Sequence, residues 1–144
     1  MAKRTGNAGF SLIEILLVVA IMGILAGVAI PSYLGQRRRA RSIGDAQSTA
    51  QIMRMALETY KADNGTYPTP GPFVWTGTFG NAAATVPNPN PLPAFSTGYS
   101  KMNYTLAVAN NGLTYTITVF DPSISAATIL YQTDQTGETL QQLN

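Results

Sequence analysis

The chain contains no cysteine and no histidine, and charged residues make up only 11% of it. Without cysteine there is no disulfide framework and no thiolate metal site. Without histidine the chain lacks the commonest general base, the usual catalytic triads and most zinc ligands. A Ser-Lys or carboxylate mechanism is not formally excluded, but no spacing indicates one. We therefore expect no enzyme, no cofactor, no metal centre and no catalytic residue.

The net positive charge of the chain comes from its beginning. The formal net charge is +2, and Lys3 and Arg4 supply it. Once residues 1–9 are removed, seven Lys and Arg residues balance seven Asp and Glu residues. No overall basic field remains to attract nucleic acid, so no nucleic-acid partner is predicted.

A long apolar run follows this basic leader. Residues 10–34 number twenty-five, and a helix of that length spans about 37 Å, against about 30 Å for the hydrocarbon core of a bilayer. One acid, Glu14, interrupts the run. A charge at membrane depth costs about 2.5–3.5 kcal/mol on insertion scales, so it is rarely without a role. The combination indicates assembly in a membrane rather than catalysis.

A secretory signal peptide is the plainest alternative for this region. It would also show Lys3 and Arg4 first, then an apolar core, then small residues near a cut such as Gly27-Val28-Ala29. That interpretation predicts a secreted binding domain that starts near Ile30. Glu14 within the apolar core and the helical pattern beyond Pro31 argue against it. A third hypothesis, a single-pass anchored enzyme, has no convergent acids to support it.

Gly23, Gly27 and Pro31 indicate a weak point in the apolar helix. Glycines four residues apart share a helical face and let backbones approach closely in lipid, although glycine is ordinary in membrane helices. Each glycine weakens a helix by about 1 kcal/mol in water, and proline removes a backbone donor. We expect kinking or local melting between Gly23 and Pro31, or else that Pro31 marks where the helix leaves the bilayer.

Beyond Pro31 the helical pattern becomes amphipathic. Apolar residues recur three or four positions apart, which is typical of a helix with one buried stripe: Ile43, Ala46, Ala50, Met53, Leu57 and Tyr60. Asn64-Gly65 is a helix stop, with Pro68 shortly after. A helix from Phe10 to Asp63 would have 54 residues and be about 80 Å long. Half of it must be buried in lipid or in other subunits.

A basic cluster lies just past the apolar span and consists of Arg37, Arg38, Arg39 and Arg41. It is either a solvated interfacial face or a contact to lipid headgroups or to carboxylates of neighbouring copies, such as Asp45 or Glu58. Counting positive charges on each side of the span favours an external N-terminus.

The C-terminal half reads as a long loop followed by strands. Seven of the nine prolines fall in residues 68–98, which predicts an irregular connection that Phe73, Trp75 and Phe79 fasten to the core. Residues 99–109, 113–120 and 129–133 read as three strands of an antiparallel sheet covered by the helix stripe.

Turn residues separate these strands. Asn110-Asn111-Gly112 is a hairpin signal, and Asp121-Pro122 ends the second strand. Asp121, Asp134 and Glu138 form at most a weak calcium set, and ordinary turn acids are the favoured interpretation.

The N-terminal string resembles the type IV pilin and pseudopilin family. Gly9-Phe10-Ser11-Leu12-Ile13-Glu14 and the apolar run through Pro31 carry the resemblance, which covers about the first 35 residues. The basic leader, the Gly-Phe junction and the acid four residues after Phe10 occur together, so the motif is specific. Asn64-Gly65-Thr66-Tyr67-Pro68 is similar to the family more weakly. The resemblance implies an α+β fold, with a long N-terminal helix and a small antiparallel sheet packed on its second half in a lollipop shape.

The family resemblance also implies processing and assembly. A prepilin peptidase would cut after Gly9 and N-methylate Phe10, which requires a cytoplasmic N-terminus and overrides the charge count. The subunit would be a single-pass inner-membrane protein that then joins a helical homo-polymer, an extracellular pilus or a periplasmic pseudopilus. Its partners would be further copies, the inner-membrane assembly platform and the pilus or secretion ATPase machinery. In a dry filament core, Glu14 would pair with the Phe10 amine of a neighbour.

The resemblance divides the chain into four parts: leader 1–9, transmembrane and filament-core helix 10–34, amphipathic helix 35–64, and head 65–144. Many major pilins close a C-terminal loop with two cysteines, which this chain lacks. That absence is compatible with a cysteine-free pilin and with a pseudopilin of a type II secretion system. Both alternatives stay open at this point.

Overall fold

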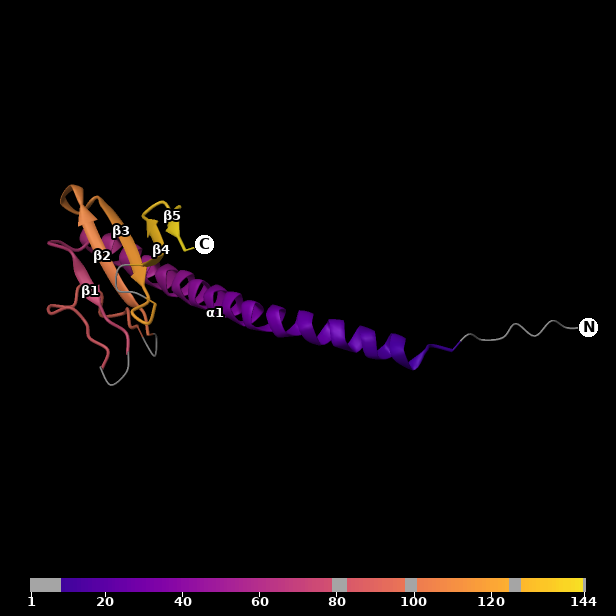
Figure 1. Cartoon of the computed structure of the whole chain (residues 1–144). Coiled ribbons are helices and arrows are strands. Elements are labelled where there is room, and N and C mark those ends of the chain that lie inside the picture. Colours follow the sequence, from indigo (N-terminus) through magenta and orange to yellow (C-terminus); the bar gives the residue numbers. More distant parts are fainter. Residues whose placement is uncertain (1–8, 79–82, 98–100, 125–127, 144) are drawn as a thin grey trace, which may run out of the picture. The chain divides into compact units, whose positions relative to one another are not determined.

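The computed structural model describes residues 9–78, 83–97, 101–124 and 128–143 (Figure 1). The chain divides into two compact units, Met1–Arg39 and Ala40–Asn144. One long helix and one antiparallel sheet confirm the α+β fold. The elements in chain order are α1 (Leu12–Asn64), β1 (Phe73–Trp75), β2 (Asn103–Ala109), the 3-10 turn η1 (Asn110–Gly112), β3 (Thr114–Phe120), β4 (Ile129–Asp134) and β5 (Thr139–Gln142).

The predicted long helix is confirmed as a single element. α1 has 53 residues and carries Pro31 in its interior. Its end follows the expected stop signal. The backbone N–H of Gly65 donates to the Lys61 carbonyl at 2.7 Å, and the Asn64 side-chain amide donates to the Tyr60 carbonyl at 2.9 Å. Gly65 has a φ of +81°, a conformation that glycine adopts without strain, so the chain turns out of the helix there.

The sheet has the strand order β1-β2-β3-β4-β5, with every neighbouring pair antiparallel. The predicted hairpin is confirmed between β2 and β3, whose register runs from Asn103 opposite Phe120 to Ala109 opposite Thr114. Asn110, Asn111 and Gly112 all have positive φ in the connecting turn. The residue types of that turn, which tolerate this backbone, explain why the sequence signal was reliable.

The helix stripe and one face of the sheet form the core. Ala46, Ala50, Met53 and Leu57 of α1 are fully buried, and Ile43 and Tyr60 at the two ends of the stripe are partly buried against the same cluster. The sheet side of the cluster comes mostly from alternating positions of the three central strands: Tyr104, Leu106, Tyr115, Ile117, Val119, Leu130 and Tyr131. The expected packing of the amphipathic half on a sheet is thus confirmed.

The sheet has five strands where three were expected. β1 lies inside the proline-rich connection, where three residues pair with β2. Its Trp75 is fully buried and Phe73 packs on the core, so both fasten the loop as predicted. β5 was missed because its four residues are all exposed and show no alternation. The expected strand start at Tyr99 and the expected anchor Phe79 lie outside the described residues, as do residues 1–8 of the leader.

Candidate assembly site in the N-terminal helix

The apolar half of α1 is uncovered in the single chain. It is the one helix of the described residues that is long and apolar enough to cross a membrane, and none of its most apolar 18-residue window is buried. Phe10, the residue after the expected cleavage point, is 77% exposed. Such a continuous apolar surface is not stable in water, so lipid or other protein must cover it.

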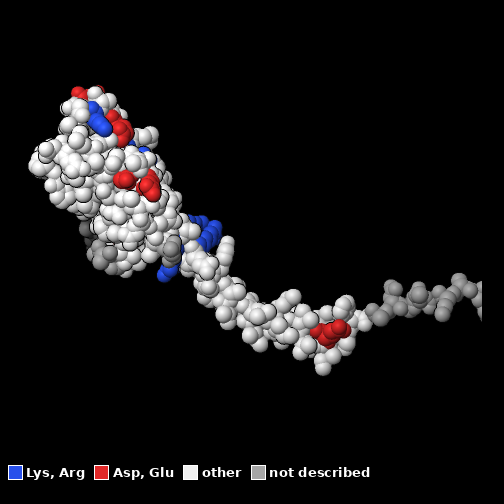
Figure 2. Space-filling model, turned by 90° about the horizontal axis from the view of Figure 1, so that it is seen from above, with Lys and Arg blue, Asp and Glu red and all other residues white. Residues whose placement is uncertain are grey.

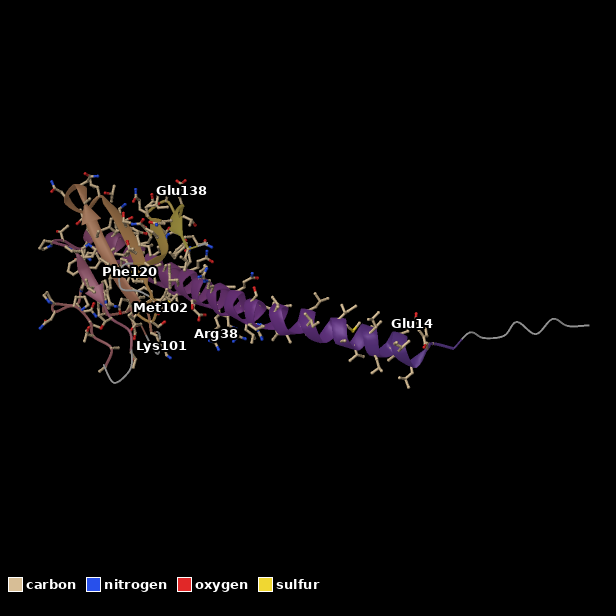
Figure 3. All side chains as sticks on the ribbon, viewed as in Figure 1. Glu14, Arg38, Lys101, Met102, Phe120 and Glu138 are labelled. Carbon is tan, nitrogen blue, oxygen red and sulfur yellow. The ribbon has the colours of Figure 1, made fainter. Side chains whose placement is uncertain are left out.

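Glu14 is the single charge on this surface. Between residues 9 and 36 no other charged residue occurs, and Figure 2 shows that part of the helix white apart from one red site. Glu14 lies in the first turn of α1, and its backbone N–H donates to the Ser11 carbonyl at 3.0 Å. Its side chain is exposed and projects from the helix (Figure 3). A carboxylate in the first turn is favoured by the helix dipole, which helps to tolerate the charge there.

Gly23 and Gly27 leave open space on the helix. A Cβ built on either residue would meet no atom within 4 Å. The described residues therefore give no packing reason for glycine at these positions. Another helix could approach the α1 backbone there, as small residues allow in lipid. The helix continues across Pro31 in the single chain, and flexibility between Gly23 and Pro31 stays a prediction.

The four arginines of the basic cluster, Arg37, Arg38, Arg39 and Arg41, are all exposed on α1. Arg38 is labelled in Figure 3, where its side chain extends away from the helix axis. The two acids suggested as partners, Asp45 and Glu58, are both exposed. One carboxylate oxygen of Glu58 accepts a hydrogen bond from the Tyr67 hydroxyl at 2.8 Å. Contact of either acid with the arginines of another copy stays a prediction.

Glu58 lies at the centre of a polar cluster that sequence reasoning missed. The Tyr115 hydroxyl also lies within 3.5 Å of the same Glu58 oxygen, and the Tyr67 and Tyr115 rings meet edge to face at 4.6 Å. Lys61 lies over the Tyr67 ring, 4.6 Å from its centroid. Burial first, and then the neighbouring Glu58 carboxylate, raise the pKa of Tyr67 well above its ordinary value. The cluster holds the segment after the helix against the sheet.

The segment Asn64-Gly65-Thr66-Tyr67-Pro68 reaches the sheet through the β2–β3 turn. The Tyr67 N–H donates to the Gly112 carbonyl at 2.9 Å. A Cβ on Gly112 would lie 2.9 Å from the Tyr67 carbonyl oxygen, and Gly112 has a φ of +83°. Only glycine fits this contact. The helix stop and the hairpin turn, which are separate signals in the sequence, therefore meet in one junction.

Removing the Tyr67 hydroxyl should destabilise this junction. We expect Tyr67→Phe to lower the free energy of unfolding by about 1.5–3 kcal/mol, because the hydroxyl donates to a charged carboxylate. Chemical unfolding of the full chain in detergent, followed by tryptophan fluorescence, measures the loss. Tyr33→Phe makes the same chemical change at an exposed position and should leave the unfolding midpoint unchanged. Equal effects of the two variants would contradict the assignment.

The three acids considered for calcium do not form a ligand set. Among the described residues, no group of three or more Asp, Glu, His or Cys side chains could hold a metal ion. The Asp121 carboxylate accepts from the Ser123 N–H at 2.8 Å, and the Asp134 carboxylate accepts from the Thr136 N–H at 2.8 Å. The hydrogen bond from Thr136 lowers the pKa of Asp134 below its ordinary value. Both acids thus support their own turns.

Comparisons with known proteins agree with this N-terminal site. Residues 4–30 match the family model described as the prokaryotic N-terminal methylation motif. The chain is similar to proteins named type II secretion system core protein G. The identity is 39% over 70 residues in Klebsiella michiganensis, where the match covers 46% of this chain and 46% of the relative.

Two further relatives show a similar identity and coverage. In Vibrio cholerae the identity is 39% over 69 residues, covering 48% of this chain and 47% of the relative. In Pseudomonas aeruginosa it is 38% over 66 residues, covering 46% of each. The chain thus spans about half the length of the curated relatives it matches. No solved structure matches the chain significantly.

The motif places the chain among proteins whose N-terminus has the prepilin type of methylation signal. The similarity to core protein G and the helix-and-sheet fold agree with this motif, and together they support a likeness to the type IV pilin and pseudopilin family.

Proposed function

We propose that the chain is a structural subunit of a pilin-type helical filament, with no catalytic role. The observation that carries this proposal is Glu14, a single charge on an uncovered apolar helix, inside a matched methylation motif. The four parts of the chain then have separate tasks. The leader 1–9 directs processing, 10–34 anchors the subunit and forms the filament core, 35–64 supports the head, and 65–144 forms the filament surface.

Processing comes first. A prepilin peptidase hydrolyses the bond between Gly9 and Phe10 and methylates the new amine of Phe10. Both residues are exposed and lie outside the helix, so the bond is accessible. The N-terminus faces the cytoplasm before assembly, and the subunit is then a single-pass protein of the inner membrane.

Assembly moves the apolar helix from lipid into a protein core. Glu14 there needs a positive partner, and the Phe10 amine of a neighbouring copy supplies one. A buried ion pair adds little net stability but fixes register well, because an unpaired charge in the core is costly. Gly23, Gly27 and Pro31 let the helix adjust as it enters the filament, and Arg37, Arg38, Arg39 and Arg41 contact headgroups or carboxylates of other copies.

The comparisons favour one kind of filament over the other. The relatives are named as core proteins of the type II secretion system. We therefore favour a periplasmic pseudopilus over an extracellular pilus. In that setting the partners are further copies of the chain, the inner-membrane assembly platform and the secretion ATPase.

The mature N-terminus tests the proposal directly. We expect intact-mass and peptide mass spectrometry of the protein from its native host to show a chain that begins with N-methylated Phe10. The mass should fall by the nine leader residues and rise by one methyl group. A chain that begins near Ile30 would instead show an ordinary signal peptide, and the proposed role of Glu14 would be wrong.

A further inference from the structure

Three consecutive arginines follow the uncharged part of α1 and point in different directions. Arg37, Arg38 and Arg39 are exposed and belong to the same compact unit as Glu14. Successive residues of an α-helix are turned by about 100° from one another, so these side chains leave the helix over about 200° of its circumference. Figure 2 shows blue side chains on two sides of the helix where its white segment ends. We call these three residues the arginine collar.

The collar lies about one bilayer thickness from Glu14 along α1. Arg37 comes 23 residues after Glu14, and no charged residue lies between them. At about 1.5 Å per residue this separation is about 35 Å, slightly more than the hydrocarbon core of about 30 Å. When Glu14 is at one surface of a bilayer, the collar is therefore at the level of the lipid phosphates of the other surface.

The chain offers the collar no carboxylate at this level. No Asp or Glu occurs from Ile15 to Gly44. Another copy anchored in the same membrane presents its own collar at the same depth, and like charges repel. A protein surface also meets a helix from one side, whereas headgroups surround it and can reach side chains that point in several directions. Lipid phosphate is therefore the anion that suits the collar while the subunit is in the membrane.

We propose that the arginine collar binds the phosphate groups of anionic phospholipids in the leaflet that faces away from the cytoplasm. A planar guanidinium group binds phosphate oxygens through paired hydrogen bonds. Adjacent positive charges favour a lipid with net negative charge over a zwitterionic one, in which a headgroup cation offsets the phosphate. This inference rests on the proposed function, which places residues 10–34 across the membrane. It adds the class of lipid that holds the subunit there before assembly.

Electron spin resonance measures the lipid preference of the full chain in phosphatidylcholine vesicles. Spin-labelled phosphatidylglycerol and spin-labelled phosphatidylcholine are added to separate samples, and the immobilised fraction of each lipid gives their relative association constant. We expect the native chain to favour phosphatidylglycerol about fivefold, and less so at high salt. The triple variant Arg37→Gln, Arg38→Gln, Arg39→Gln should reduce this preference roughly threefold, since Arg41 remains.

A pair of single variants provides the matched control. Arg38→Gln and Lys101→Gln each remove one positive charge from an exposed side chain, and both residues are labelled in Figure 3. Arg38→Gln should lower the preference for phosphatidylglycerol measurably, whereas Lys101→Gln, in the head, should leave it unchanged. Fluorescence of the buried Trp75 during urea unfolding should be the same in all variants, which shows that the head is intact.

Three outcomes would overturn the inference. Equal association of the two lipids with the native chain would show that the collar does not select anionic lipid. An unchanged preference in the triple variant would assign the preference to other residues, and a simultaneous loss of filaments would assign the collar to carboxylates of other copies. Equal association by a chain that begins with N-methylated Phe10 leaves the proposed function standing. A mature chain that begins near Ile30 would overturn both.

Discussion

Replacing Glu14 with alanine is expected to abolish filament assembly and to leave membrane insertion intact or improved. Removing the carboxylate relieves a cost of about 2.5–3.5 kcal/mol in lipid. If Glu14 pairs with the Phe10 amine of a neighbour as proposed, the substitution leaves that amine unpaired in the filament core, which costs about 3–5 kcal/mol. The filament yield should therefore fall roughly a hundredfold or more. Membrane fractionation measures insertion, and electron microscopy of sheared material measures filaments.

The position of Glu14 also suits a local role in the helix start, which has to be separated from pairing. Ser11 and Glu14 have the spacing of a capping box, in which Glu or Gln at the third helical position supports the start of the helix. Glu14→Gln keeps this capacity and removes the charge, whereas Ser11→Ala weakens the cap and keeps the charge. We expect Glu14→Gln to fail in assembly and Ser11→Ala to assemble. Normal filaments from Glu14→Ala or Glu14→Gln would show that no charge pair forms.

The N-terminal methylation motif could be predicted from the sequence because its signals are local, whereas the roles of its residues in assembly stay predictions. A charge within an apolar run, a Gly-Phe junction and a basic leader lie within fourteen residues. The amphipathic stripe was equally clear, because helical periodicity depends only on near neighbours. Ala46, Ala50, Met53 and Leu57 are all buried as the spacing required.

The elements that escaped prediction depend on distant partners. β1 has three residues between prolines, and only its pairing with β2 makes it a strand. β5 reads as polar coil and is ordered by pairing with β4. Glu58 looked like a free surface acid, because nothing nearby in the sequence reveals that Tyr115, 57 residues away, approaches it. Pairing over such distances leaves no periodic pattern in a single sequence.

The junction of helix and sheet keeps the second half of α1 packed on the head. The core stripe of α1 stays buried only while this side of the helix is held against the sheet. Four fully buried side chains of α1 and the Glu58 cluster supply that hold. A head that loosened from its helix would expose the core stripe to water.

Truncating Leu57 should therefore destabilise the head severely. Leu57 is 0% exposed within the stripe, and removing a buried leucine side chain costs about 2–5 kcal/mol. That is a large part of the 5–15 kcal/mol by which most domains are stable. Trp75 is the single tryptophan and is fully buried in the same core. Its fluorescence during urea unfolding of the full chain in detergent reports the loss for Leu57→Ala.

Met55→Ala is the matched control for this variant. Met55 lies two residues earlier on the same helix and is 63% exposed. Alanine is the best helix former, so neither substitution weakens the helix itself. We expect Met55→Ala to shift the free energy of unfolding by less than about 0.5 kcal/mol, since surface substitutions rarely do more. Similar losses in both variants would mean that α1 does not bury its stripe against the sheet. A loss confined to Leu57→Ala shows that this side of the helix packs on the head.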